Sequence, residues 1–235
     1  MRVAPETKIE DIVVGDHRKP HFITVVPTLG MVPIEFHIAS SRLQSPVNAI
    51  SAMLAVKGME VGVARNYAIN EILKADPCPE YIFFLGDDML PPWDGLVKLY
   101  SAISTGEWDC LTGLYYWKGE PPTPLTWRKG KVGPLLPDID FILGEIVQVD
   151  VTGMDFTLIR TEALRKMDPN EAYFKSGPGT ALELEEYGEY VPKDKVIQWT
   201  EDVYFCGKAI RAGLRIGVHT GVRVAHLDVK TGAIW

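Results

Sequence analysis

Short unbroken runs of apolar residues alternate along this chain with stretches in which apolar residues recur at helical spacing. The clearest apolar run is Tyr81–Leu85, which leads directly into Gly86 and two carboxylates before Pro91 and Pro92 end the segment. A run of this length, bounded by Gly and Pro, is typical of a strand that is buried on both faces inside a parallel sheet. The pattern therefore predicts an α/β fold with this strand inside the sheet.

The remaining pattern divides the chain into further strands and helices. Strands are expected at 22–26, 49–56, 109–114, 145–151, 154–159, 215–218 and 222–225. Helices are expected at 31–45, 60–75, 93–104, 161–167 (capped by Thr161) and 201–212 (capped by Thr200). Residues 31–45 are ambiguous, because the apolar positions there also alternate as in a strand. A parallel neighbour of the first strand needs a crossover of about a dozen residues, which favours the helix.

Two long stretches fit neither pattern. Residues 115–137 carry tyrosines and tryptophans among several prolines and glycines. Such rings either hold a sugar or another flat apolar group, or pack onto the surface of their own domain. Residues 168–196 are mostly polar, and a loop of this length in a compact domain is usually a lid or a mobile segment. We expect residues 115–127 and 168–196 to shape one side of a binding site.

Asp87 and Asp88 follow the apolar strand, so they lie at the carboxyl edge of the sheet, where open α/β folds bind their ligands. Two adjacent carboxylates repel each other unless they share a cation or a proton. The pair therefore indicates either a divalent-metal site or an exposed Asp-Asp turn, and these two residues alone do not decide between them.

Length and composition narrow the class of protein. A chain of 235 residues fits one large α/β domain, or a domain with a small appendage. A net charge of −7 disfavours a broad nucleic-acid-binding surface, although an anionic small molecule can bind if a metal supplies positive charge. The three cysteines form no CxxC pair, which favours a reducing compartment. Residues 1–20 lack the apolar region of a signal peptide and no membrane span is found, so we expect a soluble, cytoplasmic protein.

Four separated signatures occur together in this chain. They are Val25–Thr28 (VVPT), Ala64–Asn66 (ARN), Phe84–Met89 (FLGDDM) and Thr200–Asp228, which contains TEDVYFCGKAIRAGLRI and VRVAHLD. In this order they resemble the GT-A glycosyltransferases, most closely the inverting family 2 enzymes that use nucleotide-sugar donors. The resemblance spans roughly residues 22–228. It implies a GT-A fold, which is Rossmann-like α/β with a mixed, mostly parallel central sheet flanked by helices.

The resemblance also implies a division of the chain. Residues 1–20 would be an N-terminal extension, and residues 21–235 a single GT-A domain. Within that domain, about 21–114 would form the half that binds the nucleotide sugar, and 115–235 the half that holds the acceptor and the catalytic residues.

By the same resemblance, the carboxylates after the apolar strand belong to a DxD motif that binds Mn²⁺ or Mg²⁺ at the two phosphates of the donor. Asp88 matches the last, metal-binding aspartate of the motif, and Asp87 matches the middle position. Gly86 is a departure, since the motif begins with Asp, and it weakens the usual contact at that place. His226 matches a histidine that completes the metal site, whereas a histidine at a strand end is otherwise more often structural.

Asp202 matches the catalytic base of the family, with Glu201 beside it. A carboxylate at a helix N-terminus would be ionised near neutral pH, as a base must be. The same two acids also suit the first turn of any helix, where the helix dipole favours negative charge.

Other positions match parts of the family that bind substrates. Pro27, Thr28 and Arg65 match positions that line the nucleotide base, although Arg65 equally suits an ion pair on its own helix face. Gly153 and Trp199 are assigned to the acceptor side.

The implied activity is metal-dependent transfer of a sugar from a UDP- or GDP-type donor to a hydroxyl acceptor such as a glycan, with inversion. A divalent ion would neutralise the diphosphate leaving group, and a carboxylate would take the proton of the acceptor hydroxyl. A retaining transferase stays open, as does a catalytically silent GT-A module that binds nucleotide sugar or glycan, which Gly86 makes plausible. A sugar nucleotidylyltransferase is disfavoured, because the turn at Pro27–Gly30 lacks the Gly-rich, Lys-containing phosphate loop of that class. The sequence names neither the sugar, the base, the acceptor nor the oligomeric state.

Overall fold

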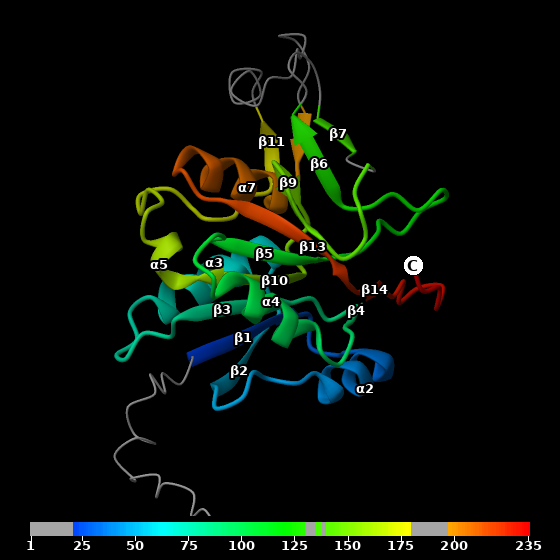
Figure 1. The fold of residues 1–235 in the computed structure, drawn as a ribbon, viewed down its shortest axis with the longest axis horizontal. Coiled ribbons are helices and arrows are strands. Elements are labelled where there is room, and N and C mark those ends of the chain that lie inside the picture. The colour runs from blue at the N-terminus through cyan, green and yellow to red at the C-terminus, as the bar shows by residue number, and fades with distance from the viewer. Residues whose placement is uncertain (1–20, 130–134, 138–139, 180–196) are drawn as a thin grey trace, which may run out of the picture.

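A seven-stranded sheet runs through the protein. The computed structural model describes residues 21–129, 135–137, 140–179 and 197–235. In spatial order the strands are β2 (Ile50–Lys57), β1 (His21–Thr28), β3 (Tyr81–Leu85), β10 (Phe156–Arg160), β5 (Cys110–Leu114), β13 (Ile216–Arg223) and β8 (Ile146–Gln148). Five strands run in one direction, while β10 and β8 run in the other. The sheet is therefore mixed and mostly parallel, as predicted (Figure 1).

The strand predicted from the apolar run is β3, and all five of its residues are buried. It pairs in parallel with β1 on one side and antiparallel with β10 on the other. Successive side chains of a strand point to opposite faces of the sheet. Ile82 and Phe84 join one hydrophobic core, whereas Tyr81, Phe83 and Leu85 join a second core. An unbroken apolar run is thus what a strand packed on both faces requires.

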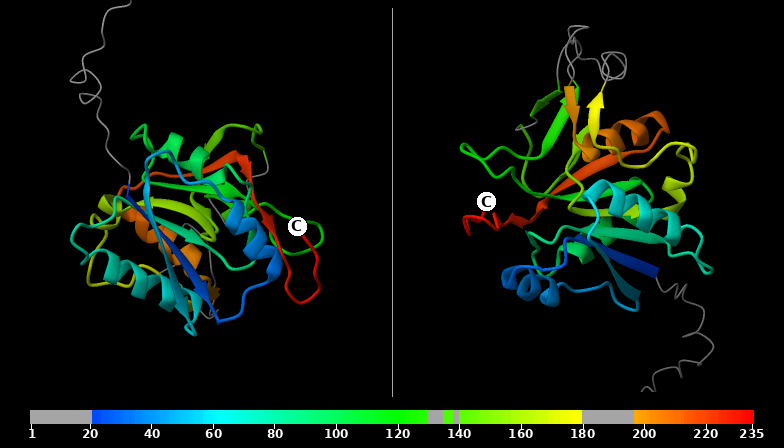
Figure 2. Two further views of the ribbon diagram at one scale, coloured as in Figure 1. Left: turned by 90° about the horizontal axis from the view of Figure 1, so that it is seen from below. Right: turned by 180° about the vertical axis from the view of Figure 1, so that it is seen from behind.

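Helices cover both faces of this sheet (Figures 1 and 2). The core of Phe84 is closed by α3 (Val61–Ile72), α5 (Thr161–Leu164) and α7 (Glu201–Arg211). The opposite core is closed by α4 (Gly95–Ile103), with Phe36 of α2 (Ile34–Arg42) at its border. The helical interpretation of 31–45 is therefore confirmed over Ile34–Arg42, with Pro33 as the N-cap residue.

One detail of the predicted helices was wrong. Thr161 does not cap α5, because its hydroxyl donates to the carbonyl oxygen of Pro79, 2.6 Å away, and the N-cap residue is Arg160. This acceptor lies 82 residues away in the sequence, so the residues around Thr161 could not indicate it. Thr200 is the N-cap residue of α7 as expected, but its side chain makes no capping hydrogen bond.

The two strands expected at 215–218 and 222–225 are joined in β13, whose pairing with β5 is irregular between His219 and Arg223. A short strand, β14 (Ala225–His226), follows it.

Both stretches expected to be irregular contain short strands. A three-stranded sheet joins β6 (Thr126–Lys129), β7 (Leu135–Pro137) and β9 (Val151–Thr152), and a second pair joins β11 (Gly177–Gly179) and β12 (Ile197–Trp199). Tyr115 is 1% exposed and packs in the core, whereas Trp117 is 64% exposed. Residues 180–196 of the second stretch, like 1–20, lie outside the described residues.

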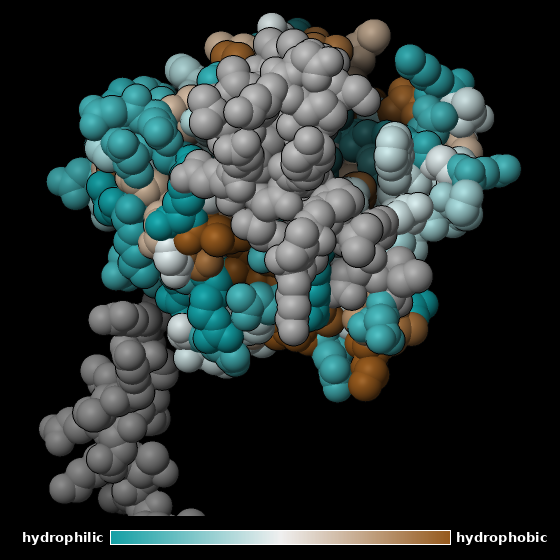
Figure 3. Space-filling view, turned by 90° about the horizontal axis from the view of Figure 1, so that it is seen from above, coloured by the Kyte–Doolittle hydropathy of each residue, from teal (hydrophilic) through white to brown (hydrophobic). Residues whose placement is uncertain are grey.

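The described surface is mainly hydrophilic on the side where β6 and β11 lie, with small apolar areas scattered over it (Figure 3). Scattered apolar side chains of this kind are normal for a folded protein. None of the helices that the structure describes has the length and apolar character needed to cross a bilayer.

Candidate active site

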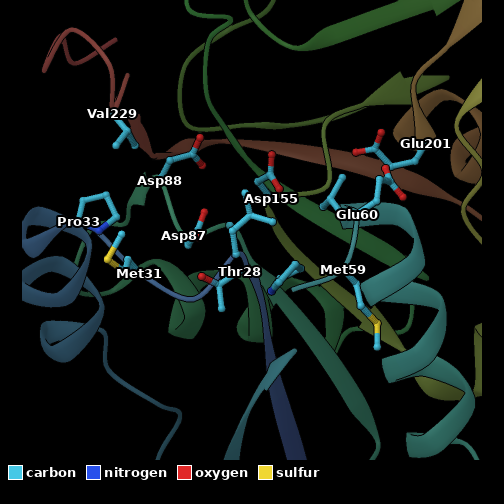
Figure 4. Close-up of a pocket in the computed structure, with 14 residues that line it drawn as sticks. Thr28, Met31, Pro33, Met59, Glu60, Asp87, Asp88, Asp155, Glu201 and Val229 are labelled. Carbon is cyan, nitrogen blue, oxygen red and sulfur yellow. The ribbon is translucent and has the colours of Figure 1, made fainter. Parts of the chain in front are cut away.

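A pocket of about 540 Å³ opens at the carboxyl ends of β1 and β3 (Figure 4). The two strands are parallel, so the residues that follow them meet at the same edge of the sheet. The lining includes Pro27, Thr28, Glu60, Gly86, Asp87, Asp88, Asp155, Glu201 and Val229. All the predicted nucleotide-binding residues except Arg65 are therefore in one pocket. Its carboxylates make it strongly acidic, so an anionic ligand needs a cation to bind here.

Asp88 and His226 are brought together by the pairing of β4 (Met89–Leu90) with β14. The N–H of Leu227 donates to the carbonyl oxygen of Asp88 at 2.9 Å, which fixes the two backbones against each other. His226 Nε2 lies 3.4 Å from Asp88 Oδ2. His226 Nδ1 lies 2.9 Å from the carbonyl oxygen of Tyr116. A carbonyl can only accept, so Nδ1 carries a hydrogen and donates to Tyr116, which leaves Nε2 facing Asp88.

Lys118 contacts the same oxygen of Asp88. Burial alone raises the pKa of Asp88, but hydrogen bonds with His226 and Lys118 lower the pKa to about 2. Asp88 is therefore ionised at neutral pH. Burial also raises the pKa of Asp87, against a hydrogen bond from Thr28, and the charge of Asp88 raises it further. The two neighbouring aspartates thus have different electrostatic environments.

The side chains around Asp88 suit a divalent cation whose remaining ligands come from a bound substrate and water. A carboxylate oxygen and an imidazole nitrogen are both ligands of such ions, and Asp88 and His226 supply one of each. Within the described ranges, no group of three or more His, Cys, Asp or Glu side chains could hold a metal. Mg²⁺ in particular is usually held by one or two carboxylates, with substrate phosphates and water completing the shell. The pair therefore suits an ion bridged to a phosphate, for which Lys118 has to release Asp88.

Three carboxylates converge on Arg65, which is 1% exposed. Its Nη2 donates to Asp155 Oδ1 at 2.5 Å, and its Nη1 donates to Asp202 Oδ1 at 2.7 Å and to Glu201 Oε1 at 3.2 Å. A buried guanidinium is stable only when it is paired in this way. Its plane also lies near the ring of Phe174, with 5.2 Å between Cζ and the ring centroid. The structure thus gives Arg65 a different set of contacts from the predicted nucleotide base.

Arg65 joins α3 to the N-terminus of α7, where Asp202 and Glu201 lie in the first turn. Burial raises the pKa of Asp202 to about 7, Arg65 opposes the shift, and Asp155 and Glu201 add to it. The expectation that Asp202 is fully ionised near neutral pH is therefore corrected, because burial outweighs the helix dipole and the guanidinium. A carboxylate that changes protonation state near neutral pH is suited to accept a proton in a reaction.

Comparison with known proteins gives a match in structure alone. No family model and no curated protein sequence matches the chain. Among solved structures, A197 from STIV is similar over 91% of this chain and 92% of its own, with a TM-score of 0.58 and 19% identity. GalNAc-T7, solved with UDP, GalNAc and Mn²⁺, is similar over 91% of this chain and 45% of its own, with a TM-score of 0.55 and 11% identity. The fold is that of the GT-A glycosyltransferases. This part of the prediction is confirmed.

Within this GT-A fold, sequence reasoning missed Asp155, which lies between β9 and β10 and lines the pocket. One feature of the sequence could have indicated it: Asp155 is a single carboxylate between Met154 and Phe156, in a segment whose other residues are typical of a buried strand. Lys118 was missed as well, since nothing in its local sequence points to Asp88. Contacts made only by the tertiary fold leave no periodic pattern in the sequence.

The two residues assigned to the acceptor side are described unequally. A Cβ at Gly153 would lie 2.0 Å from Tyr115 Oη, so close packing requires glycine there. Trp199 ends β12 opposite Gly177, and its side chain lies outside the described part of the structure. Their role toward an acceptor stays a prediction.

Proposed function

We propose that this protein transfers a sugar from a nucleoside-diphosphate donor of the UDP or GDP type to an acceptor hydroxyl, with inversion, using Mn²⁺ or Mg²⁺. The observation that carries the proposal is the shared location of two groups at one pocket. Asp88, whose Oδ2 lies 3.4 Å from His226 Nε2, and Glu201, which precedes Asp202 in α7, both line it, on either side of Asp155 (Figure 4). GalNAc-T7, which shares the fold, was solved with UDP and Mn²⁺.

Donor binding requires positive charge in an acidic pocket. Asp88 and His226 would hold the divalent ion, which when bound neutralises the charge on a departing diphosphate. Pro27 and Thr28, at the end of β1, line the same pocket beside Asp87 and would contact the nucleoside. Lys118 would supply positive charge besides that of the metal ion. If it released Asp88, its ammonium group would be free to contact a phosphate oxygen.

Asp202 would take the proton of the acceptor hydroxyl. Its Oδ1 is held by Arg65, which fixes the direction of the carboxylate. In an inverting reaction the acceptor attacks from the side opposite to the leaving group. That geometry needs the base and the diphosphate site at opposite ends of the transferred sugar, and the placement of α7 and the β4–β14 pair supports it (Figure 4).

The rate of transfer should rise with pH through about 7, because Asp202 acts only when it is deprotonated and burial raises its pKa to about 7. Initial rates at saturating metal and donor, measured across about two pH units on either side of that value, check this expectation. A rate that stays flat across the range would show that another group accepts the proton.

Replacing Asp88 by Asn should weaken Mn²⁺ binding in the presence of a nucleoside diphosphate by at least about tenfold, as should His226→Ala. Isothermal titration of Mn²⁺ into the protein with UDP or GDP measures this loss. Asp87→Asn, which changes the neighbouring carboxylate, is the matched control and should have a smaller effect. Equal losses for the three variants would mean that the pair is not the metal site.

A second candidate function is a GT-A module that binds a nucleotide sugar or glycan without transfer. The contact of Lys118 with Asp88 favours it, since an internal cation already neutralises the carboxylate. Donor binding without donor hydrolysis or transfer would support this module. If transfer is found, NMR of the product's anomeric proton distinguishes inversion from retention.

A further inference from the structure

Gly86 and Asp155 share one small space at the bottom of the pocket. A Cβ built on Gly86 would lie 2.9 Å from Asp155 Cβ and 3.0 Å from its Cγ and Oδ1. The first distance is shorter than real Cβ contacts and the other two are tight, so a side chain at position 86 requires Asp155 to shift. The Gly86 N–H also donates to the carbonyl oxygen of Asp155 at 2.7 Å, which ties the two backbones together. The carboxylate of Asp155 thus takes the room that a side chain at 86 would need.

Asp155 is held in one orientation by groups that do not reach into the pocket. Its Oδ1 accepts from Arg65 Nη2 at 2.5 Å, and its backbone N–H donates to Tyr115 Oη at 3.0 Å. Its Oδ2 has no hydrogen-bond partner among the described residues, and its side chain is 27% exposed where it lines the pocket. A fixed carboxylate with one free oxygen is a ready hydrogen-bond acceptor.

The position of this oxygen follows from a chain of contacts. Asp155 packs on Gly86, two residues before Asp88, and it shares Arg65 with Asp202. It therefore lies between the end of the pocket that would hold the diphosphate and the end that would hold the base. Figure 4 shows Asp155 between Asp88 and Glu201. A sugar transferred between these ends has to pass over Asp155.

The carboxylates around Asp155 favour a ligand group that is neutral and carries hydroxyls. A carboxylate accepts hydrogen bonds from hydroxyls, whereas a phosphate there would meet Asp155, Glu201 and Glu60. The nearby cation, Arg65, is buried and already shared by three carboxylates. We propose that Asp155 Oδ2 accepts a hydrogen bond from one hydroxyl of the transferred sugar, and so determines which donor sugar is used. This inference rests on the proposed function, since it assumes a nucleotide-sugar donor.

The test compares donors with and without the hydroxyl in question. The probes are UDP, GDP, a panel of UDP- and GDP-hexoses, and deoxy analogues of the hexose that binds most tightly. In the wild type, one deoxy analogue should bind about 10- to 100-fold more weakly than its parent, the size expected for a hydrogen bond to a charged group. In Asp155→Asn this penalty should shrink by about tenfold, while affinity for UDP or GDP alone stays within about twofold.

Two further variants keep the test independent of folding defects. Asp94→Asn, which removes a carboxylate of similar exposure at the start of α4, is the matched control and should keep the full penalty. Gly86→Ala retains the Asp155 carboxylate but forces it to shift, so it should weaken the penalty too. Gly86→Ala combined with Asp155→Asn should be no worse than Asp155→Asn alone, because both act through one oxygen. Thermal unfolding of each variant confirms that it is folded.

The outcomes separate the two claims. If the wild type binds neither UDP nor GDP nor any nucleotide sugar, the proposed function fails, and this inference fails with it. If the wild type binds and turns over a nucleotide sugar but Asp155→Asn keeps the whole deoxy penalty, the assignment of Asp155 alone is overturned. A penalty lost in Asp155→Asn and kept in Asp94→Asn supports it.

Discussion

Replacing Asp202 by asparagine should lower kcat for sugar transfer by about 10²- to 10⁴-fold, the usual contribution of a general base. Asparagine cannot accept the proton of an acceptor hydroxyl, yet its side-chain oxygen can still accept the hydrogen bond from Arg65 Nη1, which is 2.7 Å from Asp202 Oδ1. The fold and the affinity for the donor should therefore change little. Single-turnover transfer with metal and donor saturating isolates this step.

Glu201→Gln is the matched control, because Glu201 lies in the same turn and contacts the same guanidinium at 3.2 Å. It should lose less activity than Asp202→Asn, and the rise of its rate with pH should persist. In Asp202→Asn the remaining rate should no longer rise through about pH 7, the pKa to which burial raises Asp202. Wild-type transfer rates in Asp202→Asn would show that the base is another residue.

Arg65→Met should cost about 3–5 kcal/mol of folding free energy, the usual result when one partner of a buried ionic cluster is removed. Methionine fills much of the space, but Asp155, Glu201 and Asp202 then face one another without a cation. Burial raises the pKa of Asp202 to about 7, and without Arg65 its ionisation is compensated even less, so the loss should increase as the pH is raised. Urea unfolding at several pH values measures both effects.

Activity adds a second readout for Arg65. The guanidinium holds down the pKa of Asp202 against burial, so Arg65→Lys, which keeps one charge but not the fork of donors, should shift the rate profile to higher pH. Arg160→Met is the control, since Arg160 is part-buried on the carbonyl oxygens of Ile103 and Trp108. It should lower stability without moving the pH profile. Unchanged stability in Arg65→Met would mean that the guanidinium does not compensate these carboxylates.

The strands inside the sheet could be predicted because their sequence reflects their surroundings directly. Tyr81–Leu85 is apolar at every position, and it is packed on both faces. In helix α3, the buried residues recur at the spacing of a helix that has one buried side. The short strands β6, β7 and β9 carry no such pattern, because their pairing depends on neighbours far along the chain. Thr161 shows the same limit, since its hydroxyl was diverted to Pro79.

In the candidate site too, single residues could be predicted from the sequence, but their tertiary contacts could not. Asp88 follows β3 and His226 ends β14, each matches a motif, and the fold places their side chains 3.4 Å apart. Arg65, Asp202 and Glu201 were each singled out, but their contacts with one another and with Asp155 were not. These residues come from α3, the β9–β10 connection and α7, and they meet only in the folded chain. Asp155 explains why position 86 is a glycine, and that explanation requires the distance between them. Motifs locate individual side chains, whereas packing decides what each one contacts.

The central claim is that this pocket uses a divalent ion to bind and react with a nucleoside-diphosphate sugar. Calorimetric titration of UDP and GDP with and without Mn²⁺, for the wild type and Asp88→Asn, tests it most directly, with donor turnover measured on the same samples. We expect one nucleotide to bind the wild type at least about tenfold more tightly with Mn²⁺, and we expect this gain to be lost in Asp88→Asn. Nucleotide affinity that is unaffected by Mn²⁺, or a gain that survives in Asp88→Asn, would contradict the account.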